Sequence, residues 1–551
     1  MAATAGQAAV HDTGAPNREK RCILFVHGVG EQHKSQTLLW MGTALVEWVI
    51  RWCATFYPGQ HPAVGRVELS FTPNDARERD SLPFAVLHLP DQDWYLAEAW
   101  WAASNYHPDF GTMLTWSWKH LRDILSQMRR ATFERARSLF APKQHSSAPN
   151  AFWRAVDLVN CVAVAVLYLV GAIGGYPLLI LLMALAQVPF ETVQNFIVIK
   201  FLRPLLTTTA GEFKMYMDDD LQAGNIRRRI ADAAQDLLAR TGCQDLVLIA
   251  HSEGAVVSLG TLTDPTYLPL AQRVKFFTLG GGLNKSWLIN PKLHRIFGPL
   301  RGNVEWTDFW SSYDPVPAGA LDPSPRKITD VYQPNGVPST PISDQVTNNM
   351  EILTDHGAYF SNEEQILIRL AAEISAPNYR ESVFWPRDAG DDPEAFLHSW
   401  VRKRRVRVSA LALWRDVAVG LWLGSAVLPW LLGWLARVQP WGPLDQVPPT
   451  AGLAGVVVSV LRGVHDWLAS LPAIFAPLAG VAASLLQLPA AVGLAVLAGV
   501  ACVALFRLGL FIWWSPWDRN ERAAFTAAAA EHCHRRLAGA PIQRSMQVPD
   551  A

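Results

Sequence analysis

Charged side chains are scarce in this sequence. They make up 17% of its 551 residues, while hydrophobic residues reach 50%, and a soluble globular chain usually carries about a quarter charged residues. The 48 basic and 48 acidic residues cancel, so the chain lacks the basic excess that attracts nucleic acid. We therefore expect no nucleic-acid partner. The low charge also indicates that part of the chain lies in lipid.

Cysteine is also rare, and its positions suggest no chemistry. None of the six cysteines pairs with another at metal-ligand spacing, and no dinucleotide-type glycine pattern occurs in the right context. We therefore expect no metal, no cofactor, and free thiols in a reducing compartment. Residues 1–20 lack the apolar core of a signal peptide, so a disordered cytoplasmic N-terminus is expected.

Long apolar runs occur in two regions. Residues 158–190 contain no charged residue and exceed the ~20 residues that one membrane crossing needs. Glycines and a proline interrupt this run at its centre, which predicts a membrane helical hairpin inserted at 151–204. The second region, 401–517, opens with a basic cluster and predicts two to four transmembrane helices. Its apolar stretches are residues 417–436, 468–488 and 490–514.

The charges that flank these runs predict a topology. The basic cluster at 402–407 and the tail at 518–551 both favour the cytoplasmic side. Strands of one sheet must share a compartment, so the hairpin must cross an even number of times. We therefore expect an integral protein of the bacterial inner (cytoplasmic) membrane, with its soluble domain in the cytoplasm.

The rest of the chain alternates between short apolar runs and helical patterns. The runs 22–26, 246–250, 274–279 and 304–310 have the pattern of buried strands. Helical patterns lie between them, which predicts an α/β fold with a mainly parallel sheet flanked by helices. This domain is expected in two parts, 21–150 and 205–400. Ser361 and Glu364 predict a capping box for the helix that ends near Ile374.

The sharpest motif is His251-Ser252-Glu253-Gly254, directly after the apolar run that ends at Ala250. A strand, a tight turn carrying a serine, and a helix form a nucleophile elbow, here with Ala250 in place of the usual first glycine. Small flanking residues are needed because the turn is sharp and the strand and helix pack closely. The motif predicts Ser252 as a nucleophile.

With His27-Gly28-Val29-Gly30 after an early strand, the chain resembles the α/β-hydrolases, and lipases and esterases most closely in its local motifs. The resemblance covers about residues 21–150 and 205–375. It implies that the backbone N–H groups of Val29 and Glu253 form the oxyanion hole. It also implies that His27, Gly28, Gly30, His251 and Gly254 support the two motifs. We expect the Glu253 side chain to face solvent.

The resemblance also implies that an acid and then a histidine follow the nucleophile in the chain. Asp314, in an Asp-Pro-Val context, is the first candidate acid; Asp308 and then Asp322 are the alternatives. His356 is the candidate general base, because the other histidines lie before the acid or at the edge of the domain.

Together these residues predict a membrane-anchored serine hydrolase that cleaves acyl esters, especially of lipids, through Ser252, His356 and Asp314. The expected partners are a lipid or acyl-ester substrate and the bilayer, and the oligomeric state is left open. The same triad also suits an acyltransferase or a thioesterase. A catalytically retired membrane scaffold is the alternative from another class.

Overall fold

The computed structural model describes residues 18–102, 211–422 and 515–539, with short gaps, and a few positions between 112 and 155. The chain divides into two compact units. The first comprises residues 1–108, 209–400 and 525–551, and the second comprises 109–208 and 401–524. The first unit holds the β-sheet and all the candidate site residues that the structure describes.

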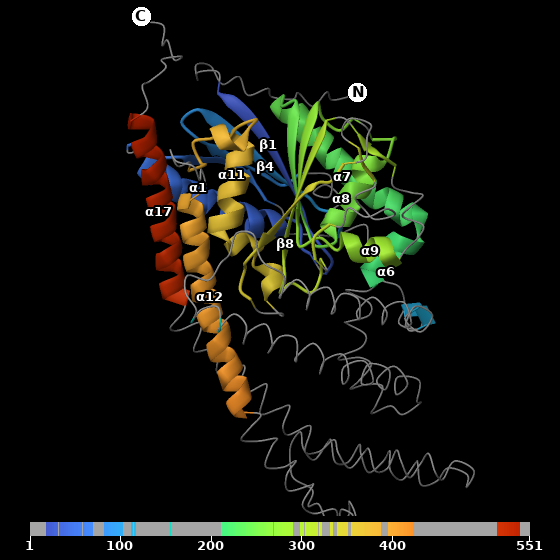
Figure 1. Ribbon diagram of the computed structural model, residues 1–551. Coiled ribbons are helices and arrows are strands. Elements are labelled where there is room, and N and C mark those ends of the chain that lie inside the picture. Colours follow the sequence, from blue (N-terminus) through green and yellow to red (C-terminus); the bar gives the residue numbers. More distant parts are fainter. Residues whose placement is uncertain are drawn as a thin grey trace, which may run out of the picture. The chain divides into compact units, whose positions relative to one another are not determined.

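A mixed sheet of eight strands forms the centre of the first unit (Figure 1). Its order is β10-β8-β6-β5-β1-β4-β3-β2. The six strands from β10 to β4 are parallel, and β3 is antiparallel to both its neighbours. The strands are β1 (Glu19–Val26), β2 (Ala63–Glu68), β3 (Phe84–His88), β4 (Gln92–Ala99), β5 (Asp245–His251), β6 (Arg273–Leu279), β8 (Val304–Ser311) and β10 (Ile342–Val346). A separate pair joins β7 (Leu300–Arg301) to β9 (Tyr332–Gln333).

Helices cover both faces of this sheet, so its central strands are apolar throughout. In β5, Leu246 and Leu248 belong to a core shared with α7 (Asp220–Thr241) and α8 (Gly254–Thr263). Val247 and Ile249 belong to a second core, shared with α1 (Thr43–Phe56) and α11 (Ile368–Ser375). Successive side chains of a strand point to opposite faces, which explains this division. The described helices are η1 (Leu38–Gly42, a π-helix), α1 (Thr43–Phe56), α6 (Gly211–Asp218), α7 (Asp220–Thr241), α8 (Gly254–Thr263), α9 (Leu283–Ile289), the short turns η7 (Asp355–Gly357) and η8 (Tyr359–Ser361), η9 (Glu363–Leu367, a π-helix), α11 (Ile368–Ser375), η10 (Tyr379–Glu381), α12 (Ala395–Trp422) and α17 (Ser515–Gly539).

The topology directs attention to the ends of β1 and β5. After β1 the chain forms β2, β3 and β4, which all lie on one side of β1 in the strand order, whereas after β5 it forms β6 on the opposite side of β5. Neighbouring parallel strands whose connections run in opposite directions leave a crevice at their carboxyl ends, where ligands bind in open α/β sheets. The His27 and Ser252 motifs follow these two strands directly.

The structure corrects the prediction of a transmembrane region. No helix among the described residues is sufficiently long and apolar to span a bilayer. The expected hairpin at 151–204 and the apolar stretches 468–488 and 490–514 lie almost wholly outside the described residues. We expected a new apolar span over 417–436, yet α12 runs unbroken from Ala395 to Trp422, and residues 423–436 lie outside the described residues. The reason is that α12 contains the whole basic cluster and a further Arg-Asp pair, which leave no long apolar window in it.

A second correction concerns the thiols. Cys22 of β1 and Cys243, just before β5, form a disulfide. The parallel register pairs Cys22 with Leu246, which brings Cys243 close although the two cysteines are 221 residues apart. Cys53 and Cys533 are buried free thiols. Sequence spacing held no sign of the pairing, because strand register creates it.

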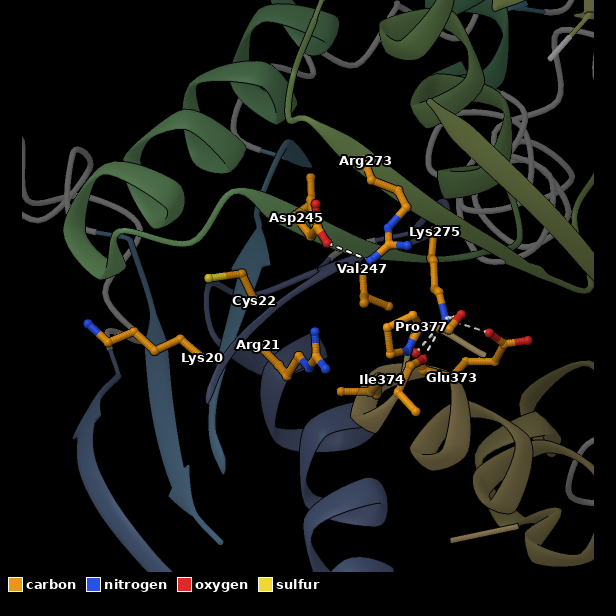
Figure 2. Close-up of a pocket in the computed structure, with 12 residues that line it drawn as sticks. Lys20, Arg21, Cys22, Asp245, Val247, Arg273, Lys275, Glu373, Ile374 and Pro377 are labelled. Atoms are coloured by element: carbon orange, nitrogen blue, oxygen red, sulfur yellow. Dashed lines mark hydrogen bonds and ion pairs between the residues drawn. The ribbon is translucent and has the colours of Figure 1, made fainter. Parts of the chain in front are cut away.

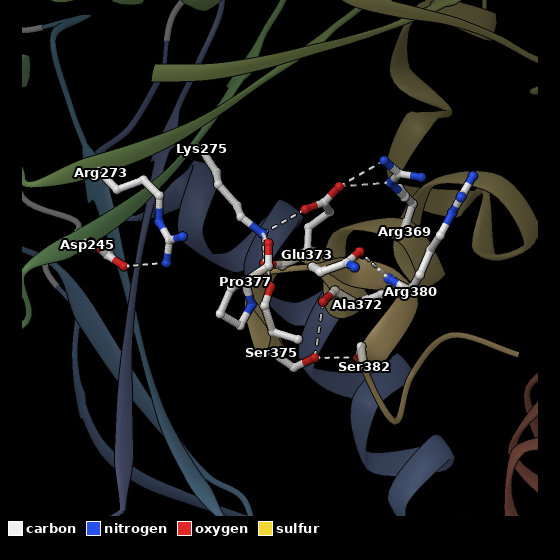
Figure 3. A network of polar contacts seen from close by, with 12 residues as sticks. Asp245, Arg273, Lys275, Arg369, Ala372, Glu373, Ser375, Pro377, Arg380 and Ser382 are labelled. Atoms are coloured by element: carbon white, nitrogen blue, oxygen red, sulfur yellow. Dashed lines mark hydrogen bonds and ion pairs between the residues drawn. The ribbon is translucent and has the colours of Figure 1, made fainter. Parts of the chain in front are cut away.

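At the amino ends of the strands, Lys275 caps the end of α11. Its buried ammonium donates to the carbonyl oxygens of Glu373, Ala376 and Pro377 and to Glu373 Oε2, at 2.7–3.0 Å (Figure 3). A cation at a helix C-terminus complements the helix dipole. The cavity beside it measures about 20 Å³ (Figure 2), which is space for about one water molecule and too small for an ester substrate.

We expect Lys275→Met to lower the free energy of unfolding by about 3 kcal/mol, because it removes one partner of a buried ion pair. Arg273→Met is the matched control: it breaks the half-exposed pair with Asp245, which is worth about 1 kcal/mol or less. Urea denaturation of both variants measures the difference. Equal losses would show that Lys275 does not hold α11.

Candidate active site

Ser252 lies in a strained turn between β5 and α8. Its φ angle is 59°, in the left-handed region that only three described non-glycine residues adopt. Such a conformation costs free energy in a residue with a side chain and is concentrated at functional sites. The Ser252 N–H donates to the carbonyl oxygen of Leu279 at 3.0 Å, which ties the turn to the end of β6. Ser252 is 6% exposed.

Two glycines leave the space for this turn. A Cβ at Gly254 would lie 2.5 Å from the carbonyl oxygen of His27, so the start of α8 passes directly against the backbone that follows β1. A Cβ at Gly28 would lie 2.5 Å from Ser252 Cβ and 3.0 Å from its Oγ. The two motifs are therefore in contact, and each glycine is required by close approach.

Asp314 and His356 form a hydrogen-bonded pair. His356 Nδ1 lies 3.0 Å from Asp314 Oδ1 and 2.9 Å from Oδ2. The Asp314 side chain is fully buried and that of His356 is 24% exposed. Asp314 Oδ1 accepts the N–H of Val316 at 2.8 Å, and Oδ2 accepts the Tyr359 hydroxyl at 2.8 Å. The carboxylate is thus held by three donors, one of them the imidazole.

These contacts fix the charge of Asp314. Burial raises the pKa of its carboxyl, but the hydrogen bond and charge of His356, the Val316 N–H and the Tyr359 hydroxyl outweigh burial, so the pKa is lowered overall. Asp314 is therefore ionised at neutral pH. An ionised carboxylate at Nδ1 keeps the proton on that nitrogen and leaves Nε2 as the acceptor that a general base needs.

His251 connects this pair to the elbow. Its Nε2 donates to the carbonyl oxygen of His356 at 2.8 Å, and the two rings lie 4.5 Å apart between centroids. Burial, with the nearby His356, lowers the pKa of His251 to about 3, so His251 is neutral. The residue before Ser252 therefore holds the backbone of the candidate base. Among the described residues, Ser252 Oγ and His356 share no direct hydrogen bond, and His251, next to Ser252 in the chain, is the residue that contacts His356.

His27 orients the candidate oxyanion loop. The backbone N–H of Trp101 donates to His27 Nε2 at 3.2 Å, which leaves the ring proton on Nδ1 to donate to the carbonyl oxygen of Gly28 at 2.7 Å. The ring also stacks on Trp101, 4.7 Å between centroids. In a trans peptide the carbonyl and the next N–H point in opposite directions. The Val29 N–H is therefore directed away from the His27 ring. Burial lowers the pKa of His27 to about 4, so this tautomer is neutral.

Glu253 and Gly30 complete the two motifs. Glu253 is the N-cap residue of α8, so its N–H lies at the positive end of that helix. Its side chain is 5% exposed, and our expectation of a solvent-facing carboxylate is wrong, because the turn packs this residue against the domain interior. Gly30 has a φ of 116°, a backbone conformation that favours glycine.

Asp308, the first alternative acid, does not contact His356. Asp308 instead accepts the hydroxyls of Thr278 and Ser343, at 2.6 and 3.0 Å. Burial raises the pKa of its carboxyl to about 7. Asp322 lies outside the described residues.

Sequence reasoning missed three supporting residues. Tyr359 donates to Asp314 and accepts the N–H of Ser311 at 3.1 Å, and Trp101 holds His27. Glu98, buried in β4, accepts the Leu38 N–H at 3.1 Å. A buried glutamate in an apolar strand was the signal that could have identified the last of these. Within the described residues, no group of three or more His, Cys, Asp and Glu side chains is arranged to hold a metal ion.

Comparisons with known proteins add no identification. No protein-family model and no curated protein matches the chain. Among solved structures, it matches a crystal structure of an uncharacterized protein from Pseudomonas aeruginosa at 10% identity, over 94% of this chain and 67% of that one. The TM-score is 0.22, which is too low to support an argument about fold or function.

We expect His27→Ala to lower kcat for an ester about 100-fold with little change in KM, because losing one oxyanion donor costs about 10²–10³ in kcat. His33→Ala, which removes an exposed histidine of the same loop, is the control and should leave kcat unchanged. Steady-state kinetics with a 4-nitrophenyl ester measures both. An unchanged kcat in a folded His27→Ala protein would contradict this role.

Proposed function

We propose that this chain is a serine hydrolase that cleaves carboxylic esters, with Ser252 as nucleophile, His356 as general base and Asp314 as the residue that orients the base. One observation carries the proposal: a buried, ionised carboxylate is hydrogen-bonded to a histidine whose backbone is held by the residue before a strained serine. Strain, buried charge and a fixed histidine in one place are features of nucleophilic catalysis.

In the acylation step, His356 Nε2 accepts the proton of Ser252 Oγ as the oxygen bonds to the ester carbonyl carbon. The carbonyl electron pair moves onto the oxygen and forms a tetrahedral oxyanion. The ionised Asp314 stabilises the imidazolium that results. Because Asp314 is fully buried, its attraction for the imidazolium is screened less than at the surface.

The oxyanion needs preorganised donors. The Val29 N–H, directed by the His27 hydrogen bond, and the Glu253 N–H at the start of α8 are the candidates. One such donor is worth about 3 kcal/mol in the transition state. The close approach of Gly28 to Ser252 supports this assignment, because it brings the loop against the nucleophile.

Collapse of the oxyanion re-forms the carbonyl and expels the alcohol, which takes the proton from His356. The acyl group remains on Ser252 as an ester. A water molecule then attacks the acyl carbon while His356 accepts one of its protons. The second collapse releases the acid and returns that proton to Ser252.

The acyl-enzyme tests the proposal. The full chain is mixed with 4-nitrophenyl acetate, quenched in acid, and digested for mass spectrometry. We expect one acetyl group on the peptide that contains Ser252, and none in Ser252→Ala. Ser339→Ala, which removes an exposed serine, should acylate like the parent chain. Acetylation spread over several residues, or absent from the parent chain, would overturn the proposal.

A further inference from the structure

An exposed aromatic side chain stands beside the candidate site. Trp40 is 43% exposed and Leu39 is 40% exposed, although Leu38 and Met41 next to them are buried. All four lie in η1, and π-helical turns are rare and occur often at functional sites. A single exposed hydrophobic residue does not by itself indicate a binding site. The argument for a function of Trp40 therefore depends on what its ring contacts.

The Trp40 ring contacts the elements that carry the triad. It meets the His251 ring edge-on, 5.2 Å between centroids, and the Phe360 ring at 5.5 Å. His251 precedes Ser252 in the chain and its ring lies against that of His356. Phe360, in η8, is buried and packs against the indole. His251 therefore connects the exposed indole both to the turn at Ser252 and to the ring of His356.

The indole is held by buried anchors. Glu98 accepts the N–H of Leu38 at the start of η1. At the other end of η1, a Cβ on Gly42 would lie 3.1 Å from Leu38 Cδ1 and 3.6 Å from the Phe25 ring. The turn is thus packed onto β1 and β4. A binding surface on a fixed element loses little conformational freedom when a ligand arrives.

The rings around the indole carry no charge. Burial keeps His251 neutral, and Phe360 is apolar and buried. A charged acyl group would gain no partner among them, whereas a hydrocarbon chain that covers the indole removes apolar surface from water.

We propose that Trp40 is the exposed wall of an acyl-binding site, and that the preferred substrates are esters of apolar carboxylic acids. The inference rests on the proposed function, because it assigns the acyl group of the same reaction. It names a specificity-determining residue that the sequence motifs do not indicate.

Chain-length selectivity tests it first. We expect Trp40→Ala to lower kcat/KM for 4-nitrophenyl octanoate at least fivefold more than for 4-nitrophenyl acetate. Leu221→Ala, which removes an 86% exposed leucine on α7, is the control and should change neither value. Equal losses on both esters would give Trp40 only a structural role and overturn the inference.

A binding measurement separates this inference from the proposed function. Calorimetry measures the affinity of the Ser252→Ala chain for octanamide and for acetamide, with and without Trp40→Ala. We expect Trp40→Ala to raise the Kd of octanamide at least fivefold. If octanamide binds through Trp40 but the parent chain forms no acyl-enzyme, the proposed function fails and the apolar site stands. If the acyl-enzyme forms and octanamide binding does not depend on Trp40, or is absent, the inference is overturned.

Discussion

Ser252→Ala is expected to lower kcat for ester hydrolysis by about 10⁵-fold or more, because removing the nucleophile of a triad removes nearly all of its joint action. The variant should fold, because alanine is smaller than serine. Both residues carry a Cβ, so the backbone strain at φ 59° is similar in the two chains. Stopped assays with 4-nitrophenyl acetate at neutral pH measure the loss.

The residual rate is informative too. Binding and the oxyanion donors alone leave about 10³–10⁴-fold acceleration over water in triad variants. We therefore expect Ser252→Ala combined with His27→Ala to be slower than Ser252→Ala alone. A Ser252→Ala chain that retains more than a tenth of the parent kcat would exclude Ser252 as the nucleophile.

Asp314→Asn is expected to lower kcat by about 10⁴-fold at neutral pH, because an amide at Nδ1 favours the wrong imidazole tautomer. The Val316 N–H donates to Oδ1 and cannot turn away, so the amide oxygen is expected to stay at that position. The NH₂ group then takes the place of Oδ2, which lies 2.9 Å from His356 Nδ1, and the Tyr359 hydroxyl can rotate to accept from it. His356 Nδ1 must then accept a hydrogen bond, so the ring proton moves to Nε2. With that proton in place, Nε2 cannot accept the proton of Ser252 Oγ.

Asp308→Asn is the matched control, because Asp308 is also a buried aspartate near the carboxyl end of a strand. It contacts Thr278 and Ser343 and not His356, so kcat should remain within a factor of three of the parent. Circular dichroism checks that both variants fold. Loss of activity in Asp308→Asn with activity kept in Asp314→Asn would reverse the assignment of the acid.

Local sequence was sufficient to predict the turn at Ser252, but it was not sufficient to predict the residues that surround this turn. The turn at Ser252 depends on neighbours in the chain, and its strand, serine and glycine are visible there. Asp314 and His356 were nominated by chain order, and the structure supplies their hydrogen bond. Trp101 and Tyr359 gave no signal, because their contacts arise from strands and loops that only the tertiary fold brings together.

The failures have physical causes as well. The capping box expected at Ser361 is wrong: Asn362 caps the helix by accepting the Gln365 N–H, while Ser361 Oγ donates to the carbonyl oxygen of Ala358. An Asn next to a Ser competes for the same role, and backbone geometry decides between them. The apolar stretch 417–436 begins inside α12, and composition does not show that a helix already begins at Ala395; residues 423–436 lie outside the described residues.

The most direct test of the central claim is labelling of the full chain by a fluorophosphonate, which reacts with activated serines. We predict one phosphonylated site, mapped by mass spectrometry to Ser252, with labelling at least 100-fold slower in Asp314→Asn and absent in Ser252→Ala. Labelling at another serine, or none at Ser252 while the chain remains folded, would contradict the account.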